Sequence, residues 1–135
     1  MEKVGVWSLT LLYTIVVLLL LLTPGSELPP IGVPLSWLHV PMFFLMSYLL
    51  FNSLTVGMPE QEQKDRHLMV VAYLVTILYS IIIEVAQQYV PGRYTSYNDV
   101  TLNIIGAALV VFSREINTIL DISADFLGVI DKEEG

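Results

Sequence analysis

An uncharged, strongly apolar run near the start of the chain constrains the fold more than any other feature. Residues 4–22 contain no charged side chain, and about 20 apolar residues in a helix are enough to cross the hydrocarbon core of a bilayer. A cleaved signal peptide has a shorter apolar core and a small-residue cleavage site, which the following Thr-Pro-Gly-Ser-Glu segment fits poorly. Only 14% of the residues are charged and 55% are hydrophobic, whereas soluble domains carry roughly 25% charged residues. The sequence therefore predicts an integral membrane protein.

Further apolar segments predict an all-α fold with four transmembrane helices. We expect the spans at about residues 4–22, 38–57, 68–89 and 99–119. The first loop contains four of the seven prolines and cannot continue a helix. Pro41 is expected in the first turn of the second span, where a missing N–H costs little. After the fourth span, apolar residues recur at helical spacing, which predicts a C-terminal amphipathic helical tail. The 135 residues leave room for a single domain, residues 1–135.

The basic residues predict the orientation of the chain in the membrane. The first loop has none and the third has only Arg93, whereas the N-terminus, the second loop and the C-terminal side of the fourth span carry the others. Since cytoplasmic loops are enriched in Lys and Arg, both termini are expected in the cytoplasm of a multi-pass protein of the cell membrane. The ends of spans two, three and four that carry the motif residues would then meet at the outer side. The cytoplasmic set is Lys3, Lys64, Arg66, Arg114 and Lys132.

A stripe of polar residues is expected on one face of the third span. Tyr73, Thr76, Ser80, Glu84 and Gln87 follow one another at steps of three and four, which places them on one helix face. Hydroxyl side chains in such a helix commonly bond to their own backbone or to a neighbouring helix. Glu84 differs, because an unpaired carboxylate in hydrocarbon costs several kcal/mol. It must be protonated, paired with a cation or open to water.

Arg93 is the obvious partner for Glu84, and it supports two interpretations. In the structural one, its guanidinium holds Glu84 or Asp99 in a bidentate pair and fixes the loop. In the functional one, its spare N–H donors receive an anionic lipid or glycan headgroup. The sequence does not choose between them, because ion-pair networks are often structural.

Three more polar residues are candidates for the same site. Asp99 is expected to cap the fourth span by accepting its free N–H groups, and Asn103 follows one turn deeper. Gly106 allows close approach of a neighbouring helix, which would bring Asn103 towards Glu84. His39, in the first turn of the second span, could be a proton carrier, a metal ligand or a hydrogen-bonded anchor.

Charge and cysteine content exclude several function classes. A net charge of −7 with only six basic residues argues against nucleic acid as a partner. The absence of Cys removes disulfides, thiol nucleophiles and Cys-based zinc sites. We expect no cofactor and no metal, the lipid bilayer is the expected environment, and the oligomeric state is left open.

The residues around the third loop resemble the signature of VanZ-like membrane proteins. In that family an acid and a glutamine end one helix, a Pro-Gly-Arg turn follows, and Asp and Asn open the next helix. The likeness extends to four spans, to a Thr-Pro-Gly loop at residues 23–25 and to a histidine that opens the second span. The chain departs from the usual family pattern at Leu35, Ser36, Phe43 and Val110. The matching residues are His39, Glu84, Gln87, Pro91, Gly92, Arg93, Ser96, Asp99, Asn103 and Gly106.

The resemblance implies a role at the cell envelope and an association with resistance to glycopeptide antibiotics such as teicoplanin. It also implies that His39 and the matched polar residues from Glu84 to Asn103, with Gly106, form a ligand-binding site. It does not decide whether the protein is an enzyme. Three hypotheses follow: an outward-facing pocket for a lipid or glycan headgroup, a membrane enzyme using Glu84, Asp99 and His39 on a lipid-linked substrate, or a structural subunit of a membrane complex. The first two predict an open cavity at Glu84 and Arg93, and the third predicts buried, fully paired groups.

Overall fold

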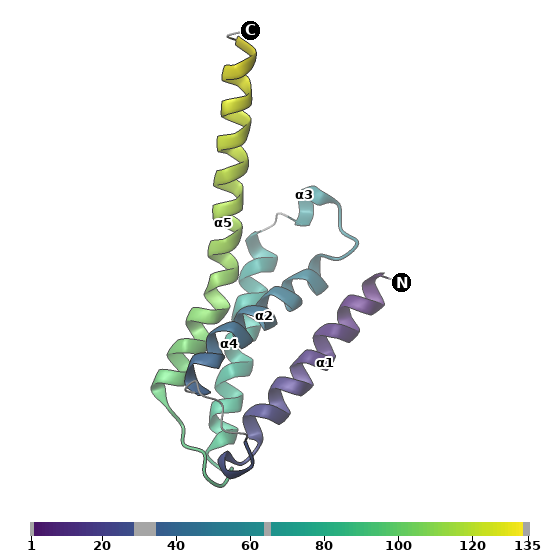
Figure 1. Ribbon diagram of the computed structural model, residues 1–135. Coiled ribbons are helices and arrows are strands. Elements are labelled where there is room, and N and C mark those ends of the chain that lie inside the picture. Colours follow the sequence, from purple (N-terminus) through teal and green to yellow (C-terminus); the bar gives the residue numbers. More distant parts are fainter. Residues whose placement is uncertain (1, 29–34, 64–65, 134–135) are drawn as a thin grey trace.

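Four long helices account for most of the computed structural model, which describes the backbone of residues 2–28, 35–63 and 66–133 and the side chains of residues 3–28, 36–63 and 66–115. They are α1 (Glu2–Leu22), α2 (Leu35–Thr55), α4 (Arg66–Gln87) and α5 (Tyr97–Glu133). A short 3-10 helix, η1 (Gly25–Glu27), and a single turn, α3 (Glu60–Gln63), lie in the connections (Figure 1). No strand occurs in these described ranges, so the prediction of an all-α fold is confirmed.

Three of the helices are long and apolar enough to cross a membrane. The segments are Lys3–Leu22, Ser36–Thr55 and Arg66–Gln87, which confirms the membrane-helix character expected for the first three spans. Their outer faces leave large apolar side chains uncovered, among them Leu11, Leu19 and Leu78. Lipid tails can cover such faces, whereas a monomer in water rarely exposes them. Among the described residues, the fourth span does not meet this criterion, and four crossings remain a prediction.

The helix boundaries differ from the expected ones in three places. Helix α2 begins at Leu35, so Pro41 lies inside the helix and not in its first turn, as we expected. Helix α4 ends at Gln87, two residues early. The fourth span and the tail form one helix, α5, that continues to Glu133. Residues 107–127 contain neither Gly nor Pro that would end it. The side chains after Glu115 lie outside the described residues, and the amphipathic face of the tail stays a prediction.

Helix α2 packs against the other three long helices. It runs beside α5 in the same direction: Val40 meets Gly106 near the start of both helices, and the Phe51 ring lies 4.2 Å from the Arg114 guanidinium further along. Polar contacts also join the helices, as is common where lipid surrounds a bundle. The Thr10 and Ser53 hydroxyls lie 2.7 Å apart between α1 and α2.

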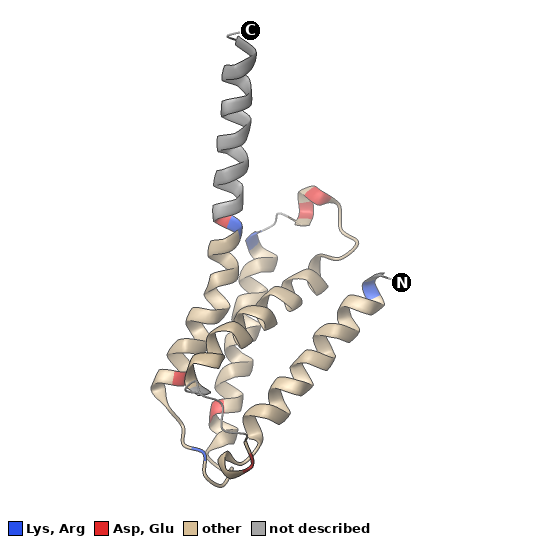
Figure 2. Cartoon of the chain, viewed as in Figure 1, with Lys and Arg blue, Asp and Glu red and all other residues tan. Residues whose placement is uncertain are grey.

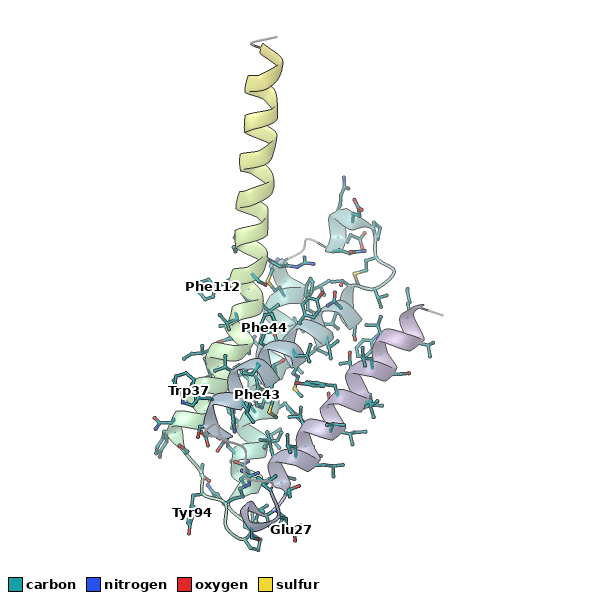
Figure 3. All side chains as sticks on the ribbon, viewed as in Figure 1. Glu27, Trp37, Phe43, Phe44, Tyr94 and Phe112 are labelled. Carbon is teal, nitrogen blue, oxygen red and sulfur yellow. The ribbon has the colours of Figure 1, made fainter. Side chains whose placement is uncertain are left out.

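Charged residues lie mainly towards the two ends of the bundle, as the colouring of Figure 2 shows. At one end, Lys3 packs against Gly57, and Arg66 forms a 3.1 Å ion pair with Glu115. The N-terminus, α3 and the middle of α5 share this end. At the opposite end, η1 lies against the turn that follows α4, and the candidate site is built there. Figure 3 places Glu27 and Tyr94 at this end, which we call the turn end.

Candidate functional site

The turn that follows α4 reverses the chain at the base of the site. Its four residues are Val90, Pro91, Gly92 and Arg93, and the Arg93 N–H donates to the Val90 carbonyl at 3.2 Å. Gly92 has a φ of 73°, a left-handed conformation that a type II turn requires at its third position, after a proline at the second. The backbone conformation of the turn therefore explains the Pro-Gly pair of the motif. The same turn determines the position of Arg93.

Arg93 and Gln87 cap the C-terminal end of α1. The Arg93 Nε donates to the Thr23 carbonyl at 3.0 Å and its Nη2 donates to the Leu20 carbonyl at 3.2 Å. The Gln87 Nε2 donates to the Leu21 carbonyl at 2.9 Å, in a buried position. The last carbonyls of a helix have no partner within the helix and carry partial negative charge. A guanidinium and an amide therefore serve there as C-terminal caps and attach α1 to α4.

This arrangement corrects the expected role of Arg93. Its guanidinium forms no ion pair with Glu84 or Asp99, both of which are described with their side chains. The two acids remain within electrostatic range of one another, and Arg93 is within range of Glu84. The bidentate pair of the structural interpretation is absent, and the Nε and Nη2 donors of Arg93 bond instead to α1 carbonyls, which the sequence could not place.

Three buried carboxylate oxygens, both of Glu84 and the Oδ1 of Asp99, make no hydrogen bond of good geometry in the described part of the chain. Glu84 is 2% exposed, and the backbone N–H of Ser96 lies near enough to its carboxylate to stabilise the charged form. The Thr95 hydroxyl donates to the backbone carbonyl of Glu84 at 3.3 Å, so the chain returns to Glu84 directly before α5 begins. An unsatisfied buried polar group costs about 1–3 kcal/mol and more when charged. The unsatisfied oxygens of Glu84 and Asp99, two acids within electrostatic range of each other, therefore need an explanation.

Asp99 does not make the helix cap that the sequence predicts. Helix α5 begins with the Ser96 carbonyl, which accepts from the Asp99 N–H at 3.1 Å and from the Val100 N–H at 3.2 Å. Within the described residues, no free N–H of the first turn reaches the buried Asp99 Oδ1. Ser96 thus occupies the N-cap position, and the Asp99 carboxylate remains available at the edge of the site.

His39 and Asn103 form a buried pair between α2 and α5. The His39 Nδ1 lies 2.7 Å from the Asn103 Oδ1, and their side chains are 3% and 1% exposed. An amide oxygen can only accept, so Nδ1 is the donor of this pair, and Nε2 is the nitrogen that faces away from Asn103. His39 is also stacked on Phe43, with ring centroids 6.2 Å apart. This is the hydrogen-bonded anchor among the three roles considered for His39.

Gly106 lets α5 approach the backbone of α2 next to that pair. A Cβ at Gly106 would lie 3.0 Å from the Val40 Cα and would contact the Val40 carbonyl oxygen still more closely. Gly25 shows a similar requirement at the turn end, where a Cβ would lie 2.8 Å from the Gly92 carbonyl oxygen. Both glycines are needed for close backbone contact, and neither can hold a ligand through a side chain.

The predicted site residues thus divide into two groups. The stripe on α4 is buried from Thr76 to Gln87, and Tyr73 is only partly buried. Thr76 and Ser80 bond to their own helix, as expected. Gln87, Arg93, Ser96 and Gly106 have structural partners, while the carboxylates of Glu84 and Asp99 do not. Throughout the described ranges, no three His, Asp or Glu side chains gather in a way that could hold a metal ion.

The sequence predicted either an open cavity at Glu84 and Arg93 or buried groups that are fully paired, and the geometry matches neither. Glu84 is buried, as a structural role requires, but its carboxylate is not paired. The sequence also missed that the α1 carbonyls take part. A Thr-Pro-Gly end to α1 signals that its last carbonyls need caps, which is the one clue that could have found them.

Comparison with protein families identifies the chain. The family model described as VanZ/LLP1 matches residues 31–116, which include α2, α4 and the part of α5 that packs on α2. Comparisons with curated proteins and with solved structures find no match. The match covers more than half of the 135 residues and contains every site residue predicted from the sequence. The chain therefore belongs to the VanZ/LLP1 family.

Proposed function

We propose that this protein acts at the cell envelope in resistance to glycopeptide antibiotics such as teicoplanin, and that its turn end binds a lipid or glycan headgroup. Family membership supports the envelope role. The observation that carries the binding proposal is the group of three buried carboxylate oxygens, both of Glu84 and the Oδ1 of the partly buried Asp99, that make no hydrogen bond in the described part of the chain. Such binding would alter envelope lipids or reduce the access of the antibiotic to them.

We further propose that α1, α2, α4 and α5 all cross the cell membrane, with both termini in the cytoplasm. The contacts from Gly106 to Arg114 keep α5 beside α2, and α2 is apolar enough to span. From Tyr97 to Arg114, α5 rises about 26 Å at 1.5 Å per residue, close to the roughly 30 Å of the hydrocarbon core. Lys3 and Arg66 lie at the end opposite to Arg93. This distribution favours an outward-facing turn end.

The energetics support a ligand over a purely structural role for the two acids. In a structural network, each buried polar group is satisfied, because an unsatisfied one destabilises the fold by about 1–3 kcal/mol. Arg93 and Gln87 follow that rule through their bonds to α1. Glu84 and Asp99 do not. Groups that destabilise the free protein and lie together are typical of sites that await a partner.

A membrane enzyme acting on a lipid-linked substrate is the second candidate. One observation favours it: the Asn103 oxygen engages His39 Nδ1 and leaves Nε2 for other partners, and Asp99 precedes Asn103 by one turn of α5. In such an enzyme Glu84 or Asp99 would be the general base, and His39 would assist proton transfer. Binding that survives in His39→Gln while substrate turnover is lost would favour the enzyme.

The test is teicoplanin susceptibility in a sensitive host that expresses each variant at matched membrane abundance. We expect the wild type to protect, and Glu84→Gln and Asp99→Asn to lose protection. Glu62→Gln is the matched control, since it makes the same chemical change at an exposed position in α3. Equal protection by all four proteins would refute the site. No protection by the inserted wild type would refute the resistance role in that host.

A further inference from the structure

We propose that the group received by Glu84 and Asp99 is a primary ammonium, such as the one an aminophospholipid headgroup carries. The inference rests on the proposed function and specifies the chemistry of its ligand. It also replaces the anionic headgroup considered for Arg93, because Arg93 donates hydrogen bonds to carbonyls of α1. The lipid headgroup and a free water-soluble amine share this chemistry, and comparing phosphatidylethanolamine with ethanolamine distinguishes them.

The number of free acceptors matches the number of ammonium donors. Three buried oxygens lack a hydrogen-bond partner among the described side chains: both Glu84 oxygens and the Asp99 Oδ1. A primary ammonium has three N–H donors and no acceptor. A hydroxyl group has one donor, so it would leave two of the three oxygens unsatisfied. A single ammonium group can donate to all three, whereas hydroxyl donors could do so only if three of them entered the site together.

The charges at the turn end also favour a cationic ligand. Two acids lie within electrostatic range of each other, and each is more stable as a carboxylate when a cation stands between them. Arg93 is within range of Glu84, but its Nε and Nη2 donate to carbonyls of α1. These bonds occupy the Nε/Nη2 edge of the guanidinium, which is therefore not open for a bidentate phosphate or carboxylate, whereas the Nη1 donors take no part in them. A cation at the two acids completes the site, whereas an anion would oppose them.

A metal cation fits the same place less well. Ca²⁺ takes six to eight oxygen ligands, and Mg²⁺ requires octahedral geometry. Glu84 and Asp99 supply two carboxylates, and within the described residues no third His, Asp or Glu joins them. His39 is directed to Asn103. The ammonium needs three acceptors, and three are present.

The position of the acids fits access from the membrane surface. Glu84 is deeply buried on α4, one turn before Gln87 ends the helix. Asp99 is partly buried in the first turn of α5. The pair thus extends from the interior to the rim of the turn end, where Tyr94 and Tyr97 are exposed at 86% and 92%. Exposed tyrosines at a helix end are typical of the headgroup layer.

The experiment is a lipid titration of purified, delipidated protein in detergent, read as thermal unfolding. The probes are phosphatidylethanolamine, its N-methyl and N,N-dimethyl forms, phosphatidylcholine and phosphatidylglycerol. The methylated series keeps the phosphate and the positive charge while it removes the N–H donors one at a time. We expect affinity to fall by roughly tenfold or more for each donor lost. Phosphatidylglycerol should not stabilise the protein.

Matched variants and a soluble probe complete the test. Glu84→Gln and Asp99→Asn should each weaken phosphatidylethanolamine binding, and Glu62→Gln should not. Ethanolamine that binds as well as the lipid would identify a free amine as the ligand, and binding of the lipid alone would identify the headgroup. Both results support an ammonium site.

Two results would refute the ammonium as the ligand, and they have different consequences for the proposed headgroup site. Equal stabilisation by phosphatidylcholine, or stronger stabilisation by phosphatidylglycerol, would refute the ammonium; if that binding still required Glu84, a headgroup site would remain. No stabilisation by any of the probes would refute the ammonium as well. Loss of teicoplanin protection in Glu84→Gln would then show that the proposed function stands with a different ligand.

Discussion

Replacing Gly106 by alanine should weaken the contact between α2 and α5. A Cβ at this position would lie 3.0 Å from the Val40 Cα and 3.1 Å from the Val40 carbonyl carbon. Ordinary carbon contacts are about 3.5–4.0 Å, and the obstacle is backbone, so it cannot turn aside as a side chain could. The two helices must separate locally, next to the His39–Asn103 hydrogen bond of 2.7 Å.

The magnitude follows from two opposing effects. Overpacking of a well-packed contact costs about 1–3 kcal/mol, whereas alanine gains up to about 1 kcal/mol over glycine in a helix. The net loss for Gly106→Ala should therefore be about 0–2 kcal/mol relative to the wild type. Gly5→Ala is the control, because Gly5 lies in α1 with nothing within 4 Å of its added Cβ. That variant should be as stable as the wild type or more so.

The assay is unfolding of the purified protein in mixed micelles, followed by circular dichroism as the denaturing detergent fraction rises. The difference between the two variants isolates the clash, since both gain the same helix propensity. We expect Gly106→Ala to unfold at a lower fraction than Gly5→Ala, by an amount equivalent to about 1–3 kcal/mol. Equal stability of the two variants would refute close backbone packing at Val40.

Three further predictions concern the ends of the bundle. Arg93→Lys keeps the charge but loses the fork that bonds two carbonyls, so amide exchange in the last turn of α1 should quicken by about tenfold or more; unchanged exchange would contradict the capping role. Arg66→Ala should change the unfolding free energy by less than about 1 kcal/mol, because its ion pair with Glu115 is largely exposed, and a larger loss in denaturation would show the pair to be structural. The chain has no Cys, so Gln61→Cys and Tyr94→Cys should react with a membrane-impermeant thiol reagent from opposite sides of the membrane; labelling from one side would contradict the four-span topology.

The membrane helices could be predicted from the sequence because apolar run length decides them. The three qualifying segments correspond to three of the expected spans to within a few residues. The differences arose where local signals are weak. Pro41 is tolerated inside α2, and the polar residues that follow the apolar part of α5 do not end that helix. Helix ends of this kind depend on local backbone bonding more than on hydropathy.

The membership of the candidate site was predictable, but its internal partners were not. The stripe on α4 followed from helical spacing, and it is buried from Thr76 to Gln87. The sequence could not show that α1 would end beside Arg93, because that contact joins residues about 70 positions apart. The structural interpretation therefore paired the Arg93 guanidinium with Glu84 or Asp99, whereas it bonds to carbonyls of α1. Once Arg93 caps α1, the acids are left unpaired, which the sequence had not suggested.

The unfolding free energy of Glu84→Met tests most directly whether Glu84 serves binding at the cost of stability. Methionine is unbranched and adapts to irregular packing, and it removes two buried oxygens that have no partner. In delipidated protein we predict that this variant is more stable than the wild type, by about 1–3 kcal/mol. A loss of stability of that size would contradict a ligand-binding Glu84 and show that its carboxylate holds the four helices together.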